Sequence, residues 1–591
     1  MAKHTGAMHV ATVKSGYVGK SGQERVYLTH LLRRTFREDG KVKHETLANL
    51  SALPDEQIEL LRRSLKGEAF VPADAASSVL RSLPHGHVAA VMAQARALEL
   101  PALLGPAGRE RDLALALVVS RVVHPRPKLA TLSWWADTTL GVDLGVADAS
   151  TDEVYAAMDW LLTRQDSIEA KLARRHLTSH TNPHRMALFD LSSSWMQGRH
   201  CPLAARGYSR DGKKGKAQIE YGLLTDPAGR PIAVRVFPGN TGDPTAFIEA
   251  VKVVRDKFGL RQMVMVGDRG MITSARIDAL RELPAEDGFG WLTCLRAPAI
   301  AALAADDGPL QMSLFDQHDL AEIHHPDYPG ERLIACRNPA LAAERARKRA
   351  DLLDATETLL APIVTAVAEG RLRGAADIGL RVGKVIDKHK MAKHLDVAIT
   401  DTTLSITRRQ ANIDAEAALD GIYVIRTSVP ANTLDPAGVV TAYKNLSHVE
   451  RDWRTIKVDD LDLRPIHHRL EDRVKAHVLI CMIAAYLVWH LRRAWAPLTY
   501  TDHTPPVRDN PVAPAQRSTT AARKASRRRD EHDQPVRSFR NLIDHLATLT
   551  RNDIQHGQHA DAPVVPTLTI PTPTQRRAFE LLDTRVPLTL T

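Results

Sequence analysis

The sequence has few cysteines and lacks the apolar segments that would place it in a membrane. Its four cysteines are widely scattered, and no two of them form a Cys-x-x-Cys pair. A disulfide framework and a zinc ribbon are therefore not expected. The N-terminal residues contain no apolar stretch of the signal-peptide type, and the longest apolar run, VLICMIAAYLVW at 478–489, is too short to span a bilayer. We expect a cytoplasmic protein without a membrane partner, in which this run is a buried helix.

The composition is that of a globular protein with a surplus of basic residues. Hydrophobic residues make up 44% of the 591 positions and charged residues 25%. A chain of this length exceeds one hydrophobic core, so several domains are expected. The net charge of +10 suits a polyanion such as nucleic acid, because Lys and Arg release counterions from phosphates. A general compositional bias is the alternative, and the clustering of the charges has to decide between the two.

The N-terminal third predicts a small β unit followed by helices. Residues 25–35 and 41–50 flank the turn sequence REDG and are typical of short strands. From about 75 to 180 the apolar residues recur at i, i+3 and i+4, as in RDLALALVVSRVV, which indicates amphipathic helices. We therefore expect a β-containing unit at 1–70 and a helical domain at 71–180.

A mixed α/β core is expected from residue 181 onward. Three strand-like segments, MALFD, AQIEYGLLTD and RPIAVRVFPG, precede a helix, and the strands QMVMVGD and GWLTCLR follow with a second helix between them. Charged and basic helical patterns interrupt this alternation before it returns with the strand-like GIYVIRTS. The pattern indicates an α/β domain in two parts, 181–296 and 421–500, with an insertion domain at 297–420 between them.

The C-terminal segment is predicted to be a linker and a helical tail. Residues 504–538 are rich in Pro, Ser, Thr and Arg, with RKASRRRD at the centre, which is typical of linker composition. Two short helical patterns follow, FRNLIDHLATLT and TQRRAFELL. We therefore expect a basic linker and a helical tail at 501–591.

Two of the expected core strands end on an aspartate. MALFD ends on Asp190, and MVMVGD ends on Asp268. Carboxylates at the ends of neighbouring strands can bind one divalent cation while the apolar strand bodies hold them rigidly. Either aspartate alone could equally cap the loop or helix that follows its strand. Their pairing is what indicates a metal site.

A third acid lies on the helix predicted at 441–457. Glu450 falls within the apolar stripe of this helix, where a carboxylate needs a partner. Tyr443, Glu450 and Lys457 are each seven residues apart, so they drift by only about 20° per step and share one face. An ordinary ion pair from Glu450 to Arg454, four residues further on, is the alternative.

Two aspartates on strands and a glutamate on a helix suit a two-metal site for phosphoryl transfer. Two Mg²⁺ ions, with Mn²⁺ as an alternative, would activate the attacking oxygen and stabilise the leaving one. Because a phosphodiester is an anion, cations must also stand nearby, and Arg269 next to Asp268 either balances the acids or meets phosphate. The stretch RGYSRDGKKGK at 206–216 adds basic residues spaced by small ones, although a solvated charged hairpin is the alternative. These residues include Arg210, Lys213, Lys214 and Lys216. No phosphate-binding loop sequence is present, so no nucleotide cofactor is expected.

These motifs, in this order, resemble the insertion-sequence DDE transposases of bacteria, a family with an RNase H-like catalytic domain. The stretches that carry the resemblance are LFDLSSSWMQG, GYSRDGKKGKAQIEYGLLTD, VFPGNTGDP, VGDRGMITSARI, KMAKHL and LRPIHHRLEDRVKAHV. One group of this family has a Tyr-Arg-Glu-Lys signature on its glutamate helix. Tyr443, Glu450 and Lys457 match its spacing, whereas Leu446 holds the place of the arginine. The resemblance runs from about residue 20 to residue 500.

The resemblance implies a fold and a role for each motif residue. The fold class it implies is α/β, with an RNase H-like mixed sheet interrupted by a β-rich insertion at 297–420 and preceded by the small β unit and the helical domain. Tyr443 and Lys457 are implied to contact DNA near the cleaved phosphate. The implied catalytic and metal-binding triad is Asp190, Asp268 and Glu450.

The function that the resemblance implies is DNA transposition. The protein is expected to bind the terminal inverted repeats of its own mobile element, through its N-terminal β and helical regions, and to catalyse metal-dependent strand cleavage and strand transfer. Element ends and target DNA are the expected partners, a homodimer is the expected synaptic state, and a bacterial cytoplasm is the expected location. Two alternatives remain, an RNase H-like nuclease that cuts without joining and a DNA-binding protein whose catalytic site has decayed.

Overall fold

The structure, a computed structural model, comprises two compact units. One unit consists of Met1–Ser82 with Asn552–Thr567, and the other of Leu83–Arg551 with Leu568–Thr591. The residues that the structure describes are 6–18, 24–68, 70, 77–178, 180–198, 200–283, 288–305, 308–557 and 562–590.

The first unit is built on β strands, as the sequence predicted. Its antiparallel sheet has the order β1 (Ala7–Val18), β2 (Glu24–Glu38) and β3 (Lys41–Asn49), and α1 (Asp55–Leu65) follows. Asp39 and Gly40 join β2 to β3 with φ angles of 49° and 76°. Two consecutive residues with positive φ form the turn that matches the twist of a tight hairpin, which explains the sequence REDG.

A second three-stranded sheet joins distant parts of the chain. Its order is β16 (Val564–Leu568), β15 (Thr550–His556) and β4 (Ser77–Pro84). The C-terminal residues therefore return to pair with a strand that lies near the start of the chain.

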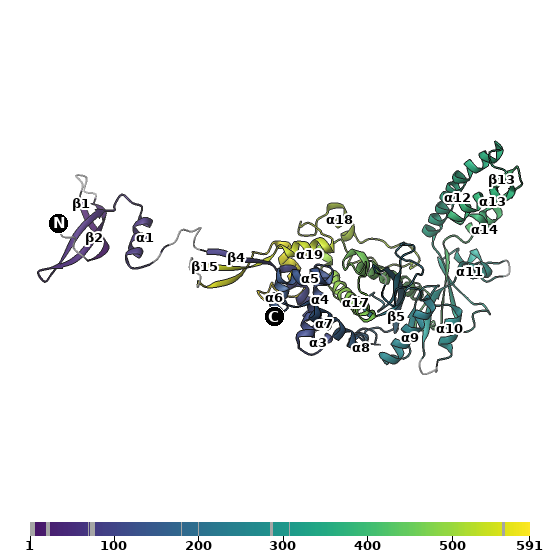
Figure 1. Ribbon diagram of the computed structural model, residues 1–591, viewed down its shortest axis with the longest axis horizontal. Helices are drawn as coiled ribbons and strands as arrows, with labels where there is room; N and C mark the ends of the chain where they lie inside the picture. Colours follow the sequence, from purple (N-terminus) through teal and green to yellow (C-terminus); the bar gives the residue numbers. More distant parts are fainter. Residues whose placement is uncertain are drawn as a thin grey trace. The chain divides into compact units, whose positions relative to one another are not determined.

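A series of helices follows β4 and belongs to the second unit (Figure 1). The best-defined start is that of α7, where Ser150 and Glu153 form a capping box. The helices are α2 (Gly86–Ala97), α3 (Leu100–Leu104), α4 (Arg109–Val123), α5 (Lys128–Ala136), α6 (Thr139–Asp143), α7 (Thr151–Thr163) and α8 (Gln165–His176). The amphipathic pattern of the sequence predicted a helical domain here.

The second unit also contains an eight-stranded mixed sheet of order β10-β11-β14-β9-β8-β5-β6-β7. β5, β6 and β7 are antiparallel, whereas β8 and β9 run parallel to β5. Helices α9 (Asp243–Lys252) and α10 (Ser274–Arg281) lie between the strands in sequence. The strands are β5 (Met186–Trp195), β6 (Gln218–Thr225), β7 (Pro231–Pro238), β8 (Val264–Val266), β9 (Gly290–Cys294), β10 (Leu320–Ile323), β11 (Arg332–Arg337) and β14 (Ile422–Thr427).

The segment 297–420 is not β-rich in its described residues, which differs from the expectation. Two of its strands, β10 and β11, extend the eight-stranded sheet instead of forming a sheet of their own. The remainder is mostly helix, and α12 and α13 lie close to the β12–β13 hairpin (Figure 1). These elements are α11 (Ala297–Leu303), α12 (Pro339–Ala368), α13 (Ala375–His389), β12 (Leu395–Ile399), β13 (Leu404–Arg408) and α14 (Gln410–Ala417). This part of the segment is helical because α12 and α13 pack together and bury an apolar cluster of their own, which includes Leu360 and Ile378.

The longest apolar run of the sequence lies in α17 (Glu471–Ala494), which packs against α4, α7 and β7. By length and composition this helix could cross a membrane, but 83% of its most apolar stretch is buried within the structure. The same composition is typical of the core helix of a globular protein. α17 is thus the buried helix that the sequence predicted, although it is longer than the apolar run.

The segment predicted as a linker is folded. Ser518 caps α18 (Thr519–Arg527) and Ser538 caps α19 (Phe539–Ala547), each by accepting a backbone N–H bond. α19 and α20 (Pro573–Glu580) correspond to the two helical patterns predicted beyond the linker, and both pack on α2. The residues of α19 that are buried are Phe539, Leu542, Ile543 and Leu546. The Ser- and Pro-rich composition reflects caps and turns between short helices here.

Lys524 fastens this C-terminal segment to the end of α17. Its side chain is 2% exposed, and Nζ donates hydrogen bonds to the carbonyl oxygens of Ala496 (2.8 Å), Thr499 (2.8 Å) and Thr501 (2.9 Å). A single ammonium group therefore satisfies three backbone acceptors at once.

Replacing Lys524 by Met should destabilise this part of the fold by about 1–3 kcal/mol, because buried carbonyls lose a charged donor. Backbone amides of α18 and of residues 496–501 should then exchange faster with deuterium. Arg523→Met is the matched control, since Arg523 is exposed on the same helix. Equal exchange rates in the two variants would show that the Lys524 bonds are not needed.

Candidate active site

Asp190 and Asp268 lie at neighbouring positions of the central sheet. β5 and β8 run parallel, and the last pair in their register joins Leu188 to Val266. Asp190 and Asp268 each come two residues later, so the same register places them side by side and on corresponding faces. Both residues line one pocket. The structure therefore brings together the two strand-borne acids that the sequence singled out.

Asp190 does not end its own strand, which corrects the sequence-based expectation. β5 continues to Trp195 because its other edge stays paired with β6 as far as Gln218. β8 stops at Val266, so among the described residues the β8 edge of β5 has no partner strand from Phe189 until Trp195, whose carbonyl accepts the backbone N–H of Ile466. Asp190 thus stands where the neighbouring strand ends.

The loop after β8 fixes one oxygen of Asp268. Its Oδ1 accepts backbone N–H bonds from Gly270 (3.0 Å) and Met271 (2.9 Å), which is the pattern of an Asx turn. The side chain is exposed, and Oδ2 has no hydrogen bond within the described part of the chain. One oxygen is therefore held by the backbone while the other remains open to a ligand.

Trp453 orients Asp190, and the sequence analysis missed this contact. The indole Nε1 of Trp453 donates to Asp190 Oδ2 at 3.0 Å, and its ring meets Tyr221 edge-on. Burial, followed by the nearby charge of Asp268, raises the pKa of Asp190 to about 6. Two carboxylates that disfavour each other's charge suit a divalent cation, which relieves the repulsion. The available signal in the sequence was a tryptophan one helical turn after Glu450.

The pocket around the two aspartates has a volume of about 460 Å³. Its walls come from β5, β6, the loop before β6, the start of α9 and the loop after β8. Four of its charged residues are acids and one is a base, so it attracts cations. These residues are Asp190, Glu220, Asp243, Asp268 and Arg210.

Arg210 belongs to the basic loop but lies within the pocket. Its backbone N–H donates to Ser193 Oγ on β5 (3.0 Å), and its Nη2 donates to Asp243 Oδ1 (2.5 Å). Lys213, Lys214 and Lys216 of the same loop are exposed. The structure therefore separates one arginine at the site from the lysines outside it.

Glu220 is a second acid that the sequence analysis did not identify. It lies in β6, is 2% exposed, and forms an ion pair with Arg210 at 3.6 Å. Burial raises the pKa of Glu220 to about 7, although the charge of Arg210 opposes the shift. The only sign of Glu220 in the sequence is an acid within the apolar strand pattern AQIEYGLLTD, and the sequence analysis did not single it out.

Glu450 is not among the residues that line the pocket. It is exposed on α16 (Leu446–Arg454), and within the described residues it forms neither the ion pair with Arg454 considered above nor another. It precedes Trp453 by one helical turn, and Trp453 is bonded to Asp190. Within the described residues, no group of three or more acids, histidines or cysteines lies close enough together to hold a metal ion, so this conformation does not bring Glu450 together with the aspartate pair.

The helix expected at 441–457 is not continuous. α15 (Pro436–Lys444) ends before α16, and Thr455–Asp459 form a π-helical turn. A π turn contains more residues than an α turn, so the seven-residue spacing from Glu450 to Lys457 does not keep the phase of a regular α-helix. The simple phase argument from the sequence was therefore wrong at its C-terminal end.

Lys457 is turned toward the base of the basic loop. It is 8% exposed, and its Nζ donates to Asp211 Oδ1 at 2.9 Å. Asp211 also pairs with Arg464 and accepts the backbone N–H of Trp195. This buried ion cluster ties the loop to β5 and to the π-helical turn, so Lys457 is engaged within the protein and is not presented to DNA in this conformation.

Tyr443 and Leu446 are both half-buried in the structure. Burial raises the pKa of Tyr443, and Cys294 and Asp268 act in the same direction, which places the phenol near Asp268. Leu446, in the arginine position of the signature, is half-buried and packs against the main hydrophobic core. Lys444, next to Tyr443, donates to the carbonyl of Val512 at 2.9 Å, so it does not replace the missing arginine.

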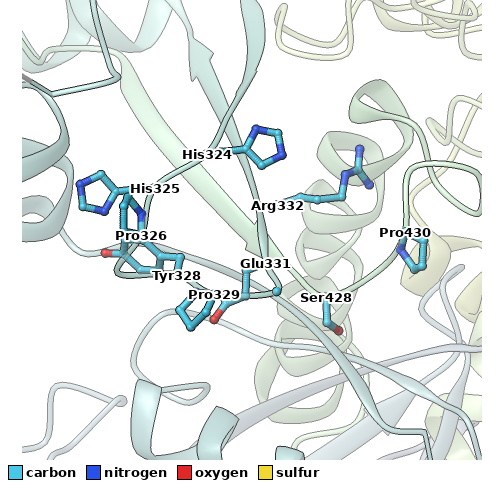
Figure 2. A pocket seen from close by; sticks show the side chains of 10 residues that line it. His324, His325, Pro326, Tyr328, Pro329, Glu331, Arg332, Ser428 and Pro430 are labelled. Atoms are coloured by element: carbon cyan, nitrogen blue, oxygen red, sulfur yellow. The ribbon is translucent and has the colours of Figure 1, made fainter.

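A second pocket, of about 640 Å³, lies elsewhere on the sheet and contains Glu331 and Arg332 (Figure 2). Glu331 accepts two hydrogen bonds from Arg426 and one from Arg281. Arg332 forms a two-bond pair with Glu322. Because these charges are matched within the protein, we assign the chemistry to the smaller pocket.

Comparison with known families identifies two regions of the chain. The model for the transposase DDE domain matches residues 192–487, and the model for the N-terminal domain of IS1634 family transposases matches residues 18–75. No curated protein matches the chain. A cryo-EM structure of the piggyBac transposase synaptic complex with hairpin DNA is 8% identical, with 75% of this chain and 71% of that chain covered. The TM-score of this similarity is 0.32.

The match to the DDE domain covers half of the 591 residues. It begins just after Asp190, includes Asp268 and Glu450, and ends within α17. The N-terminal match adds a region specific to one group of insertion sequences. This chain therefore belongs to the insertion-sequence DDE transposases.

Proposed function

We propose that this protein binds the terminal inverted repeats of its own insertion sequence and catalyses metal-dependent DNA cleavage and strand transfer. The observation that carries the proposal is the β5–β8 register, which sets Asp190 beside Asp268 in one pocket. The strand order β7-β6-β5-β8-β9, antiparallel at first and then parallel, supports an RNase H-like catalytic domain. Excision and insertion would use the same pocket.

A divalent cation suits the acids of this site, and we propose Mg²⁺ in a two-metal arrangement, with Mn²⁺ as an alternative. Asp190 and Asp268 would hold it from the sheet, and Glu450 would complete the ligand set from α16. Hard cations prefer carboxylate oxygens, and burial together with the charge of Asp268 raises the pKa of Asp190, which a bound cation would oppose. When bound, the metal supplies Lewis-acid stabilisation of the charge that develops on the phosphate.

The exposed cations near the pocket are proposed to bind the DNA backbone. Lys213, Lys214 and Lys216 are exposed on the loop before β6, and Arg269 is exposed next to Asp268. Charges of this kind bind phosphates without regard to sequence. A contact from Tyr443 is compatible with its position near Asp268, whereas a contact from Lys457 requires its bond to Asp211 to open.

The remaining organisation is also proposed from the family. The N-terminal unit at 1–70 and the helices at 71–180 would recognise the element ends, and two copies of the chain would assemble on the paired ends in the bacterial cytoplasm. The catalytic domain would comprise 181–296 and 421–500, with the insertion at 297–420 and the C-terminal segment at 501–591 as separate parts.

Replacing Asp190, Asp268 or Glu450 by Ala, one at a time, should reduce metal-dependent cleavage by roughly a hundredfold or more, because each removes charge stabilisation at the reacting phosphate. DNA affinity should change little, since the exposed lysines remain. Single-turnover cleavage of labelled element ends and fluorescence anisotropy measure the two quantities.

Asp278→Ala is the matched control for this experiment, because Asp278 pairs with Arg281 outside the pocket. Full activity in Glu450→Ala would remove Glu450 from the triad without affecting the two aspartates. Cleavage that never leads to joining of a labelled 3′ end to a plasmid would favour the nuclease alternative.

Mn²⁺ affinity should fall as the pH drops below about 6, because the metal binds the ionised carboxylate and the pKa of Asp190 is raised to about 6. Below that value the affinity should fall about tenfold per pH unit for a single competing proton. Electron paramagnetic resonance of free Mn²⁺ at pH values on both sides of 6 measures this dependence.

Trp453→Phe sharpens the pH test. It removes the hydrogen bond that lowers the pKa of Asp190, so the midpoint of Mn²⁺ binding should move to higher pH. A midpoint that stays in place in this variant would show that Asp190 does not control metal binding.

A further inference from the structure

Arg210 is fixed at both its backbone and its side chain, unlike the other cations of its loop. The backbone is tied to β5 through Ser193, and Nη2 donates to Asp243 at the start of α9. The side chain is 21% exposed. An arginine held in this way has lost much of its freedom before any ligand arrives, which favours a defined contact over loose attraction.

Glu220 approaches the same guanidinium but does not complete a bond with it. It lies opposite Ser193 in the β5–β6 register, so it shares the sheet face to which Arg210 is attached. The distance of 3.6 Å between Glu220 Oε1 and Arg210 Nη1 exceeds that of a hydrogen bond. Arg210 Nη1 and Glu220 Oε2 are both buried and have no hydrogen-bond partner within the described residues.

Buried polar groups are nearly always paired in folded proteins, so unpaired ones at a pocket indicate a ligand. An N–H of a guanidinium requires an acceptor, and a phosphate oxygen is the acceptor that its planar geometry fits best. Asp243 already occupies Nη2, so Nη1 is the group of this guanidinium that still lacks an acceptor.

The Arg210 cluster adjoins the proposed catalytic acids. The positive charge of Arg210 acts on Asp190, where it lowers the pKa against the larger effect of burial. Asp243 and Asp268 flank Gly270, because a β-carbon at that glycine would lie 3.5 Å from Asp243 Oδ2 and 3.4 Å from Asp268 Oδ1. A phosphate that reaches the aspartate pair therefore comes within the neighbourhood of Arg210.

We infer that Glu220 and Asp243 are positioning residues that hold Arg210 so that its Nη1 binds one non-bridging oxygen of the DNA phosphate being cleaved. The inference rests on the proposed function, since it requires a scissile phosphate at this pocket. It assigns Arg210 to the reacting phosphate and leaves the exposed lysines to the flanking DNA backbone.

The test uses DNA in which sulfur replaces each non-bridging oxygen of the scissile phosphate in turn, because sulfur is a weak hydrogen-bond acceptor. With the wild-type protein, one of the two sulfur substrates should be cleaved more slowly, and Mn²⁺ should not restore its rate. Rescue by Mn²⁺ would instead mean that the oxygen contacts a metal, which would contradict the inference for that oxygen.

Arg210→Gln should cleave the oxygen substrate at least tenfold more slowly at saturating DNA, and the same sulfur substitution should then have no further effect. Glu220→Gln and Asp243→Asn should each lower the rate to a smaller extent and reduce the sulfur effect. Arg210→Lys should also be slow, because an ammonium group keeps the charge but lacks the planar fork.

Glu249→Gln is the matched acid control, since Glu249 pairs with Lys252 on α9 outside the pocket. The Mn²⁺ affinity and the thermal unfolding midpoint are measured for each variant. Together they distinguish a misplaced Arg210 side chain from an unfolded protein. Glu220→Gln should keep the wild-type Mn²⁺ affinity and unfolding midpoint but show a reduced sulfur effect, which a purely structural role would not produce.

Two results would overturn the inference. Arg210→Gln could retain the full sulfur effect, or Arg210→Lys could restore the wild-type rate, in which case a fixed guanidinium is not required. Both results presuppose cleavage by the wild-type protein, so they leave the proposed function intact. Absence of cleavage by the wild-type protein would instead overturn the proposed function and this inference together.

Discussion

The unequal lengths of two parallel strands create the site on which the rest of the structure depends. β5 continues past the last residue of β8 because β6 still pairs with its other edge. The unpaired stretch of β5 leaves room beside Asp190, and the loop that follows β8 brings Asp268 to the same place. A β8 of equal length would fill this space with backbone hydrogen bonds, so the early end of one strand is as important as the acids themselves.

Ion pairs between buried charges hold the elements around this site in place. The pocket contains more acids than bases, and the protein compensates with Arg210, which is bonded to Asp243 and lies near Glu220. The next residue of the basic loop, Asp211, is neutralised by Lys457 and Arg464. Each buried charge that lacked such a partner would be costly. The two ion clusters thus hold the loop at the adjacent residues Arg210 and Asp211, and the lysines that follow them stay exposed.

The core behind the site consists of segments that are far apart in the sequence. α17 packs against β7 and against helices α4 and α7, and α19 from the C-terminal segment packs against α2. Lys524 joins that segment to the end of α17 through three carbonyl groups. The sheet that carries Asp190 therefore rests on a helical layer that includes both early and late parts of the chain.

The sequence by itself determined the local elements and the family. Apolar periodicity predicted the helices before residue 180 and the strands of the core, and the motifs around Asp190, Asp268 and Glu450 indicated a DDE transposase, which the family comparisons confirm. These features are local, since they depend on the spacing of neighbouring residues. The triad itself stays a prediction, and so do the domain boundaries.

Only the tertiary structure decided where the side chains of the site meet. It placed Arg210 and Glu220 in the pocket, bonded Trp453 to Asp190, turned Lys457 toward Asp211 and formed helix α18 within the segment expected to be a linker. The π-helical turn also changed the helical phase that the sequence predicted. The physical reason is the same in each case: these contacts join residues distant in sequence, and a residue's own neighbours do not specify which partner its charge or hydrogen bond will find.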